Sequence, residues 1–451
     1  MKPLQNVLSV ALIILSSIPP AGAQGGESSP RHISLSEAVQ LALKQNHMTK
    51  IADLKVQEKQ HAKDVARSAY FPSISNQSSV FHVTDTQFIE IPAGSIGTVS
   101  GTSLPEQPVI LNQGGRTLIT SGTGLVQPIT QLFTKVKPAN DMARADLNAS
   151  RANARETENE IALKVHQLYY AVLITQLQRD AAEARIKAAD ALRSERVQQV
   201  KYGSALEQEA IESKAQYLEA KQGFLTTELL LSNLTTQLND VLGLPVTTQL
   251  ELEPASAEVA AGCAREECVK IALESHPEII AAREEVQKAS GAVRLSKGEY
   301  IPDLSAFARY SYSDQVPFLA RNFGTFGVQF TYDIFDGGRR RAALDESNTR
   351  LTEARENLAR VTDEVEVQVQ IAYNKLQRTK EMVNVSKELL ALRSEASRVT
   401  AQQLRSGEAL QSQADRAVAQ TLDAQAVLLQ SQLDYTQASD ELTQAIGRTP
   451  E

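Results

Sequence analysis

The chain has 451 residues, of which 42% are hydrophobic and 22% are charged, and its formal net charge is −8. An acidic balance provides no basic surface for nucleic acid, and two Cys with six His that are scattered along the chain are too few for a metal-rich protein. We therefore expect neither a nucleic-acid-binding protein nor a metalloenzyme, in a chain long enough for roughly three domains.

The N-terminal segment predicts a cleaved signal peptide over residues 1–23. Lys2 precedes an apolar run from Val7 to Ile18, and Ala21-Gly22-Ala23 supplies the small residues of a cleavage site. A membrane anchor would need about 20 apolar residues, and this run is shorter. No later segment is apolar enough to span a bilayer as a helix, so a chain that crosses a membrane would have to do so with strands.

The remaining chain contains one pattern twice, with matches at a constant offset of 230 residues and then of 204 residues. We expect a first repeat over 34–243, an inter-repeat linker or equatorial segment over 244–264, and a second repeat over 265–447. The first repeat has 26 more residues, which we assign to the polar segment 82–115 and interpret as a long loop. The matches include Glu37 with Glu267, Tyr70 with Tyr300, Pro72 with Pro302, Tyr169 with Tyr373, Gly203 with Gly407, and Leu238 with Leu442.

Helices dominate each predicted repeat. The first helix opens with a capping box from Ser34 to Glu37, and both copies break after about ten residues, at Asn46-His47 and at His276-Pro277. The longest helices are expected from about 138 to 202 and from about 339 to 406, each roughly 100 Å long. The helices over 47–69 and 204–242 would stack end to end beside the first of them.

Glycines mark the ends of both long helices. Gly203 and Gly407 each follow such a helix, where the chain has to stop, turn and begin another helix. A second capping box, from Ser204 to Glu207, is expected directly after the first turn. These glycines are therefore predicted to lie at the tips of two helical hairpins.

Four short strands are expected at about 71–83, 117–129, 302–313 and 324–335. The last alternates most clearly, since Phe326, Val328 and Phe330 are separated by polar or small residues. This pattern fits a transmembrane strand, and it also fits a soluble antiparallel sheet with one buried face. Four strands cannot close a conducting barrel, so a transmembrane barrel would require several chains.

The junction motifs resemble those of the TolC-like outer membrane efflux proteins. In order along the chain, they are Leu242-Gly243-Leu244-Pro245, Tyr300-Ile301-Pro302 and Phe335-Asp336-Gly337-Gly338-Arg339. The resemblance implies a mainly α-helical homotrimer with a twelve-stranded transmembrane β-barrel, a periplasmic α-helical tunnel and an equatorial domain. The first half departs from this pattern, with Ile129-Thr130-Gln131-Leu132 in place of the Asp-Gly-Gly junction.

The resemblance also implies that the hairpin tips dock a periplasmic adaptor, or membrane fusion protein, which couples the channel to an inner-membrane pump. Acidic residues just past the turns constrict the tunnel in many members of this family. Glu209 is the candidate gate residue on that basis, with a solvated helix face as the alternative, and Gln413 is its equivalent. The tip residues are Gly203, Ser204, Ala205, Leu206, Gly407, Glu408, Ala409 and Leu410.

The sequence predicts a passive conduit of a tripartite efflux or type I secretion system, located in the outer membrane with a large periplasmic portion. We expect no enzyme activity, no cofactor and no metal site. Two alternatives stay open: a structural periplasmic coiled-coil protein without a barrel, and an envelope hydrolase with a helical stalk. A disulfide between Cys263 and Cys268 also stays open, and nothing in the sequence selects a cargo or a pump class.

Overall fold

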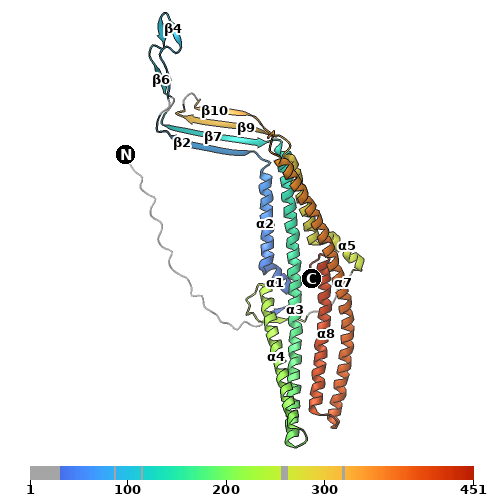
Figure 1. Ribbon diagram of the computed structural model, residues 1–451. Helices are drawn as coiled ribbons and strands as arrows, with labels where there is room; N and C mark the ends of the chain where they lie inside the picture. Colours follow the sequence, from blue (N-terminus) through green and yellow to red (C-terminus); the bar gives the residue numbers. More distant parts are fainter. Residues whose placement is uncertain (1–30, 86–87, 113–114, 255–262, 317–319, 451) are drawn as a thin grey trace, which may run out of the picture.

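The computed structural model describes residues 31–85, 88–112, 115–254, 263–316 and 320–450. The predicted signal peptide over 1–23 lies outside these residues. The described chain is mainly helical, with long helices running side by side and a four-stranded sheet extending from one end of them (Figure 1). Within the described ranges, no helix combines the length and the apolar composition needed to cross a membrane.

Two long antiparallel helical hairpins form the body of the molecule. The first helical hairpin consists of α3 (Lys137–Lys201) and α4 (Glu207–Leu242), and the second of α7 (Arg339–Ser406) and α8 (Gln411–Ala445). The longest helices, α3 and α7, have 65 and 68 residues, which corresponds to roughly 100 Å each. Helix α3 packs against both α4 and α8 and thereby joins the two hairpins.

Four shorter helices pack beside the long helices between the hairpins and the sheet. They are α1 (Leu35–Gln45), α2 (His47–Ser68), α5 (Arg265–Ser275) and α6 (Pro277–Gly298), and α2 lies above α4 beside α3 (Figure 1). Both predicted helix breaks are present because a side chain caps the next helix at each of them. The amide oxygen of Asn46 accepts the Met48 N–H at 2.7 Å, and Nδ1 of His276 accepts the Glu278 N–H at 3.3 Å.

The four-stranded sheet is antiparallel, with the order β10-β9-β7-β2. Its strands are β2 (Ser73–His82), β7 (Thr117–Pro128), β9 (Asp303–Asp314) and β10 (Asn322–Thr331), which overlap the four predicted ranges. The hairpins β2–β7 and β9–β10 come from different halves of the chain and meet between β7 and β9. Strands β2 and β10 are the two edges of this sheet.

The interpretation of 82–115 as a plain loop is wrong. The described part of this segment is a ribbon in which β3 (Phe88–Ile91) pairs with β6 (Val109–Asn112), and β4 (Gly97–Val99) pairs with β5 (Thr102–Leu104). The ribbon extends beyond the sheet (Figure 1). Strands of three or four residues separated by Gly, Ser and Pro carry too short an alternation to be recognised in the sequence.

The two larger apolar cores lie where the short helices meet the long ones. In the first, β1 (Arg31–Ile33) pairs in parallel with β8 (Leu250–Leu252), a small sheet that the sequence analysis missed. The Tyr169 hydroxyl lies 2.7 Å from the Glu253 carbonyl oxygen, and burial raises the pKa of Tyr169 to about 12. The second core packs α5 and α6 against the second helical hairpin. It contains Cys268, Ile279, Val361, Val365, Val369, Ala438 and Leu442.

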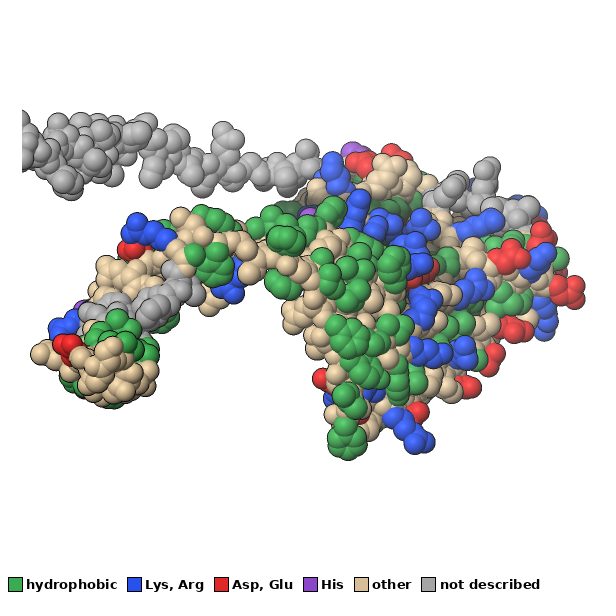
Figure 2. Space-filling model, turned by 90° about the horizontal axis from the view of Figure 1, so that it is seen from above, with side chains coloured by type: hydrophobic (Ala, Val, Ile, Leu, Met, Phe, Trp, Pro, Cys, Tyr) green, Lys and Arg blue, Asp and Glu red, His purple; other side chains and the backbone are tan. Residues whose placement is uncertain are grey.

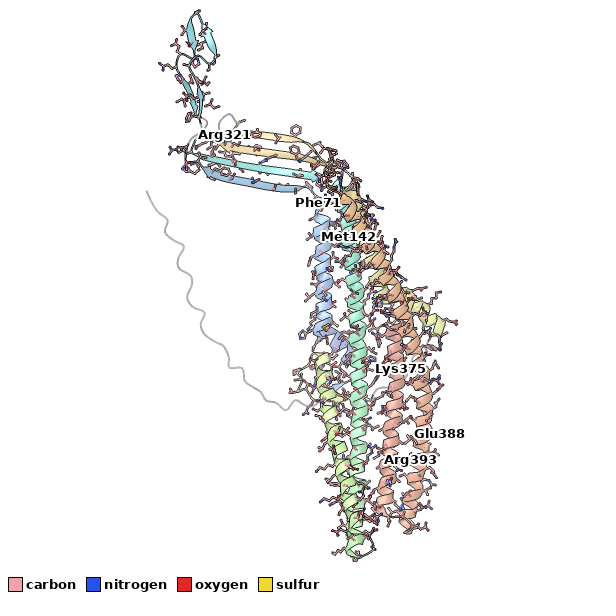
Figure 3. The ribbon with its side chains drawn as sticks, in the orientation of Figure 1. Phe71, Met142, Arg321, Lys375, Glu388 and Arg393 are labelled. Atoms are coloured by element: carbon pink, nitrogen blue, oxygen red, sulfur yellow. A yellow bond between two sulfur atoms is a disulfide. The ribbon has the colours of Figure 1, made fainter. Side chains whose placement is uncertain are left out.

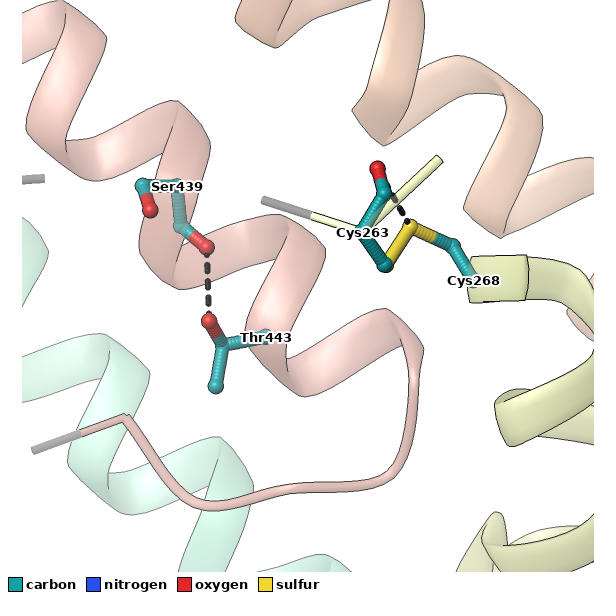
Figure 4. The surroundings of a disulfide bond; sticks show 4 residues. All are labelled: Cys263, Cys268, Ser439 and Thr443. Atoms are coloured by element: carbon teal, nitrogen blue, oxygen red, sulfur yellow. Dashed lines mark hydrogen bonds between the residues drawn. A yellow bond between two sulfur atoms is a disulfide. The ribbon is translucent and has the colours of Figure 1, made fainter. Parts of the chain in front are cut away.

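Cys263 and Cys268 form a disulfide, which decides the question that the sequence left open. Cys268 is fully buried on α5, and the bond fastens the chain that precedes this helix to its first turn. Figure 4 shows the disulfide beside the end of α8, near Ser439 and Thr443. Helical periodicity alone could not predict this bond because Cys263 lies just outside the helix.

The Asp-Gly-Gly motif builds the junction between β10 and α7. Gly337 and Gly338 have positive φ values of 64° and 88°, which favour glycine. The Asp336 carboxylate accepts the N–H groups of Gly338 and Arg340, at 3.0 and 3.1 Å, and pairs with the Arg340 guanidinium at 2.6 Å. These bonds to Arg340 lower the pKa of Asp336 to about 2. The first half, which lacks the motif, uses the π-helix η1 (Leu132–Val136) instead.

Candidate functional site at the tips of the helical hairpins

Two turns lie at the end of the helices opposite the sheet (Figure 1). The first, residues 203–206, connects α3 to α4, and the second, residues 407–410, connects α7 to α8. We call them the tip turns. They contain all eight residues that the sequence analysis assigned to adaptor docking.

The tip turns share one backbone geometry. Gly203 and Gly407 have φ values of 73° and 79°, and the next residue in each turn donates its N–H to a carbonyl five residues back. Ser204 donates to Gln199 at 2.8 Å, and Glu408 donates to Gln403 at 2.8 Å. This is the hydrogen bond of a Schellman motif. A Cβ added at either glycine would meet nothing within 4 Å, so the backbone conformation favours glycine here, and crowding does not require it.

The predicted capping box from Ser204 to Glu207 is wrong. Leu206 occupies the N-cap position of α4, and no side chain caps this helix. The Ser204 hydroxyl instead donates to the Gln199 carbonyl at 3.0 Å. Because Ser204 takes part in the Schellman turn that ends α3, it does not cap α4, and α4 begins later than the sequence pattern indicates.

The tip turns expose apolar side chains at equivalent positions. Leu206 is 68% exposed and Leu410 is 49% exposed, each directly before the second helix of its hairpin. Tyr202, next to the first turn, is 78% exposed. Ala205 and Ala409 are half-buried beneath them. Both tips therefore offer a leucine beside a small residue, an arrangement that a partner helix could cover.

The candidate gate residues are engaged within their own hairpins. A carboxylate oxygen of Glu209 on α4 lies 3.2 Å from a guanidinium nitrogen of Arg196 on α3. The amide oxygen of Gln413 accepts the Leu410 N–H at 3.1 Å and so caps the start of α8. No hydrogen bond joins Glu209 to Gln413 in the described chain, which leaves the gating role of both as a proposal.

A groove of about 630 Å³ lies between α3, α4 and α8 above the tips. Small residues line much of it, including Ala181, Gly223 and Ala426. Arg185 on α3 and Asp423 on α8 reach one another across the hairpins, with their charged atoms 2.7 Å apart. The sequence analysis missed this pair because its residues lie on helices of different repeats and share no motif.

A second contact between the hairpins lies closer to the sheet. His166 on α3 is fully buried, and its Nδ1 lies 2.6 Å from the Asp440 carboxylate on α8. The Tyr170 hydroxyl donates to the same carboxylate at 3.3 Å. Burial and this neighbouring negative charge raise the pKa of Tyr170. This buried cluster holds the hairpins together about 30 Å along α3 from Arg185.

Acidic side chains gather in a pocket of about 340 Å³ between α3, α6, α7 and α8. Burial, together with the nearby charges of Glu278 and Glu160, raises the pKa of Glu156 to about 7. Gln444 donates to Glu156 at 3.4 Å, which favours the ionised form only weakly. Among the residues that the structure describes, no group of three or more His, Cys, Asp or Glu side chains could hold a metal ion.

Comparison with known proteins shows which family the chain resembles. Residues 268–448 match the family described as outer membrane efflux protein. The resemblance to the TolC-like outer membrane efflux proteins is confirmed. The outer membrane efflux protein BepC of Brucella suis is 24% identical to this TolC-like chain over 341 residues, which cover 73% of each protein.

Solved structures share the fold of the TolC-like chain. The outer membrane channel CmeC of Campylobacter jejuni superposes with a TM-score of 0.74 at 14% identity, over 92% of this chain and 85% of CmeC. The outer membrane protein VceC of Vibrio cholerae superposes with a TM-score of 0.72 at 15% identity, over 92% of this chain and 97% of VceC. BepC is named as an efflux protein, CmeC as a channel and VceC as an outer membrane protein, and none of the three is named as an enzyme.

Proposed function

We propose that this chain is a passive conduit in the outer membrane, which carries cargo from a periplasmic adaptor and an inner-membrane pump to the exterior. Three copies would join their sheets into a twelve-stranded barrel and their helices into a periplasmic tunnel. The observation that carries the proposal is a sheet with two open edges attached to helices roughly 100 Å long. A single chain cannot close either structure.

The sheet edges support the closure of a barrel between copies. Strands β2 and β10 end the order β10-β9-β7-β2, and each presents backbone N–H and C=O groups that have no partner strand in the four-stranded sheet. In lipid, every such group needs a partner. Pairing β2 of one copy with β10 of the next would satisfy both edges, and three copies would supply twelve strands.

Exposed apolar residues at the strand–helix connections support the membrane position. Phe71, Phe133 and Phe335 are 65%, 74% and 89% exposed, and each lies in a different connection. Figure 3 shows Phe71 where the sheet meets the helices, and Figure 2 shows hydrophobic side chains gathered in this region. Aromatic residues at such a level are typical of the interface of an outer membrane barrel.

The helical columns support an aqueous tunnel. The buried positions of α8 are rich in small residues, which let neighbouring helices approach closely. Most exposed positions of α3 and α7 are polar or charged, as expected for walls in contact with water, although α4 and α7 also expose apolar side chains such as Leu229 and Val385. A hydrated passage would spare a polar cargo the cost of entering lipid. The seam on α8 includes Ala414, Ala419, Ala424, Ala426, Ser431 and Ala438.

The two proposed repeats, 34–243 and 265–447 with the equatorial segment 244–264 between them, gain support from paired element lengths. Helices α1 and α5 have 11 residues each, and α2 and α6 have 22 residues each. The helices that lead to the tips also have similar lengths, 65 and 36 residues in the first hairpin and 68 and 35 in the second, which would place both tip turns at a similar level of the tunnel. That arrangement favours the tips as the docking surface for adaptor hairpins, with the exposed Leu206 and Leu410 as contacts.

Membrane extraction and single-channel recording test this function. The full-length protein, expressed with its signal, should require detergent for extraction, migrate as a trimer and form stable pores in planar lipid bilayers. A soluble monomer in the periplasmic fraction that forms no pores would contradict the proposal and favour the periplasmic coiled-coil alternative. A hydrolytic activity that survives removal of the four strands would favour the envelope hydrolase.

A further inference from the structure

The four strands of the sheet contain three residues that are Asp, Glu, Lys or Arg: Asp303, Arg309 and Asp314. Two of them are paired at the ends of β9. The Asp303 carboxylate lies 2.8 Å from Lys135, and the Asp314 carboxylate lies 2.5 Å from Arg321. Arg309, in the middle of β9, forms no ion pair with any described residue. Of these three charged residues, Arg309 is therefore the one whose charge has no opposite partner among the described residues.

Strand alternation puts Arg309 on the polar face of the sheet. Its direct neighbours are Gly124 on β7 and Thr325 on β10, whereas Phe326 and Phe330 on β10 belong to the opposite face. Phe323, at the start of β10, lies on the Arg309 face. Phe326 is 89% exposed, so the apolar face has no cover within the described chain. In a barrel the apolar face must meet lipid, because an arginine near the bilayer midplane costs about 2–4 kcal/mol on that side. The Arg309 face would then line the lumen.

The surroundings of Arg309 form a shallow hollow of about 520 Å³, lined by polar side chains and by Phe81 and Phe323. Gln77, Ser311 and Thr325 line it together with Gly122. A Cβ added at Gly122 would lie 2.7 Å from a guanidinium nitrogen of Arg309, so the absence of a side chain there lets the guanidinium rest against β7. The guanidinium is thus held close to the sheet, and it stays accessible to solutes because Arg309 is exposed.

We propose that Arg309 is a selectivity residue that makes the sheet portion of the channel favour anionic solutes. The inference rests on the proposed trimeric conduit, in which three copies of Arg309 would form one positive ring around the lumen. Rings of arginine or lysine select anions because they raise the local anion concentration in a narrow water-filled passage. The other ionisable side chain of this face, Asp303, is paired with Lys135 at the end of β9, and the polar groups around Arg309 are uncharged hydroxyls and amides.

Reversal potentials in planar lipid bilayers test the inference. Purified wild-type, Arg309→Gln and Arg309→Lys trimers are compared across a potassium chloride gradient. Arg309→Gln should lower the chloride-to-potassium permeability ratio by about twofold at an ionic strength near 0.1 M, where screening limits the reach of each charge to about 10 Å. Arg309→Lys should keep the wild-type ratio. The matched control is Arg321→Gln, because Arg321 lies at the far end of the sheet and is already paired with Asp314 (Figure 3).

A cysteine variant makes the test independent of folding differences between proteins. Both native cysteines are in the disulfide, so Arg309→Cys would carry one reactive thiol. A positively charged thiosulfonate added to open channels should restore the wild-type permeability ratio, and a negatively charged one should shift it further toward potassium. Equal ratios before and after both reagents, in channels that demonstrably react, would overturn the role of Arg309. Failure of the wild-type protein to form pores would instead overturn the proposed conduit.

Discussion

Arg185 on α3 and Asp423 on α8 form an ion pair, 2.7 Å between charged atoms, that joins the two helical hairpins. In the described chain no hydrogen bond or ion pair closer to the tips connects the hairpins. Arg185 lies about 24 Å from the end of α3 at 1.5 Å per residue. Over the last 24 Å toward the tips, the two hairpins are therefore not joined by any hydrogen bond or ion pair of the described chain.

We predict that Arg185→Ala and Asp423→Ala loosen the tips without unfolding the protein. Both side chains are partly exposed, so the pair contributes only about 0.2–1 kcal/mol to stability. Thermal unfolding should stay close to that of the wild type. Single-channel recordings should show a higher open probability in both variants. The control is Arg398→Ala, which removes an ion pair with Glu395 within α7, and an equal rise in that variant would contradict the prediction.

Glu156 should make the stability of the helical body depend on pH. Its pKa rises from 4.5 to about 7 because burial and the charges of Glu278 and Glu160 disfavour its ionised form. Between these pH values the folded state binds a proton that the unfolded state releases, so stability falls as pH rises from about 4.5 to about 7. At pH 8 the free energy of unfolding of Glu156→Gln should therefore exceed that of the wild type, by roughly 1–2 kcal/mol after allowance for partial solvent exposure.

Denaturant unfolding followed by circular dichroism at pH 5 and pH 8 measures this difference. The variant and the wild type should be similar at pH 5, where the wild-type carboxyl is protonated. Glu353→Gln, at an exposed position on α7, controls for the loss of a surface charge. An equal increase in the free energy of unfolding of Glu156→Gln at pH 5 and at pH 8 would show that the stabilisation does not come from the titration of Glu156.

Asp336→Asn should destabilise the junction between β10 and α7. The substitution removes the charge that faces the buried Arg340 guanidinium and weakens the cap of α7. We expect a lower midpoint of thermal unfolding at pH 7 and a lower yield of folded protein. Asp333→Asn is the matched control, because Asp333 contributes its backbone carbonyl to Arg340.

The pH dependence gives an independent check on Asp336. Its pKa is lowered from 3.8 to about 2, so its stabilisation is fully present above about pH 4 and is lost as pH falls toward 2. The difference in stability between the wild type and Asp336→Asn should therefore become smaller as the pH falls from about 4 toward 2. A difference that stays constant from pH 7 to pH 2.5 would mean that the carboxylate charge does not hold this junction.

Regular features of the fold could be predicted from the sequence because each has a local physical signal. The helix bounds follow from apolar periodicity and from caps at Asn46 and Gly407, and the strands over 302–313 and 324–335 follow from alternation. The ribbon within 82–115 has strands too short for such a signal. The β1–β8 pair joins segments more than 200 residues apart, so no local pattern could indicate it.

The candidate site was predictable in part for the same reason. Gly203 and Gly407 are visible as helix-ending glycines, and their positive φ values agree with that interpretation. The partners of Arg185 and Glu209 depend on how helices rotate against one another, which a single sequence does not fix. The disulfide depends on the path of the chain before α5, where Cys263 follows no helical period.

The tip turns carry the last prediction. Gly203→Trp and Gly407→Trp should abolish export, because a large side chain beside Leu206 or Leu410 would block the close approach of an adaptor helix. Gly203→Asn and Gly407→Asn are the matched controls, since asparagine tolerates the positive φ of these positions and is much smaller. Export is measured as resistance of a deletion strain that carries each variant to the cargo of the cognate pump, and native electrophoresis checks that trimers form.

Crosslinking separates lost docking from a distorted turn. In the tryptophan variants, crosslinks between the tips and the adaptor should disappear while pores in planar bilayers persist, because the four-stranded sheet lies at the opposite end of the helices from the substitution. The asparagine variants should keep both crosslinks and export, since they preserve the Schellman geometry with little added bulk. Normal export by both tryptophan variants would exclude the tip turns as the docking surface.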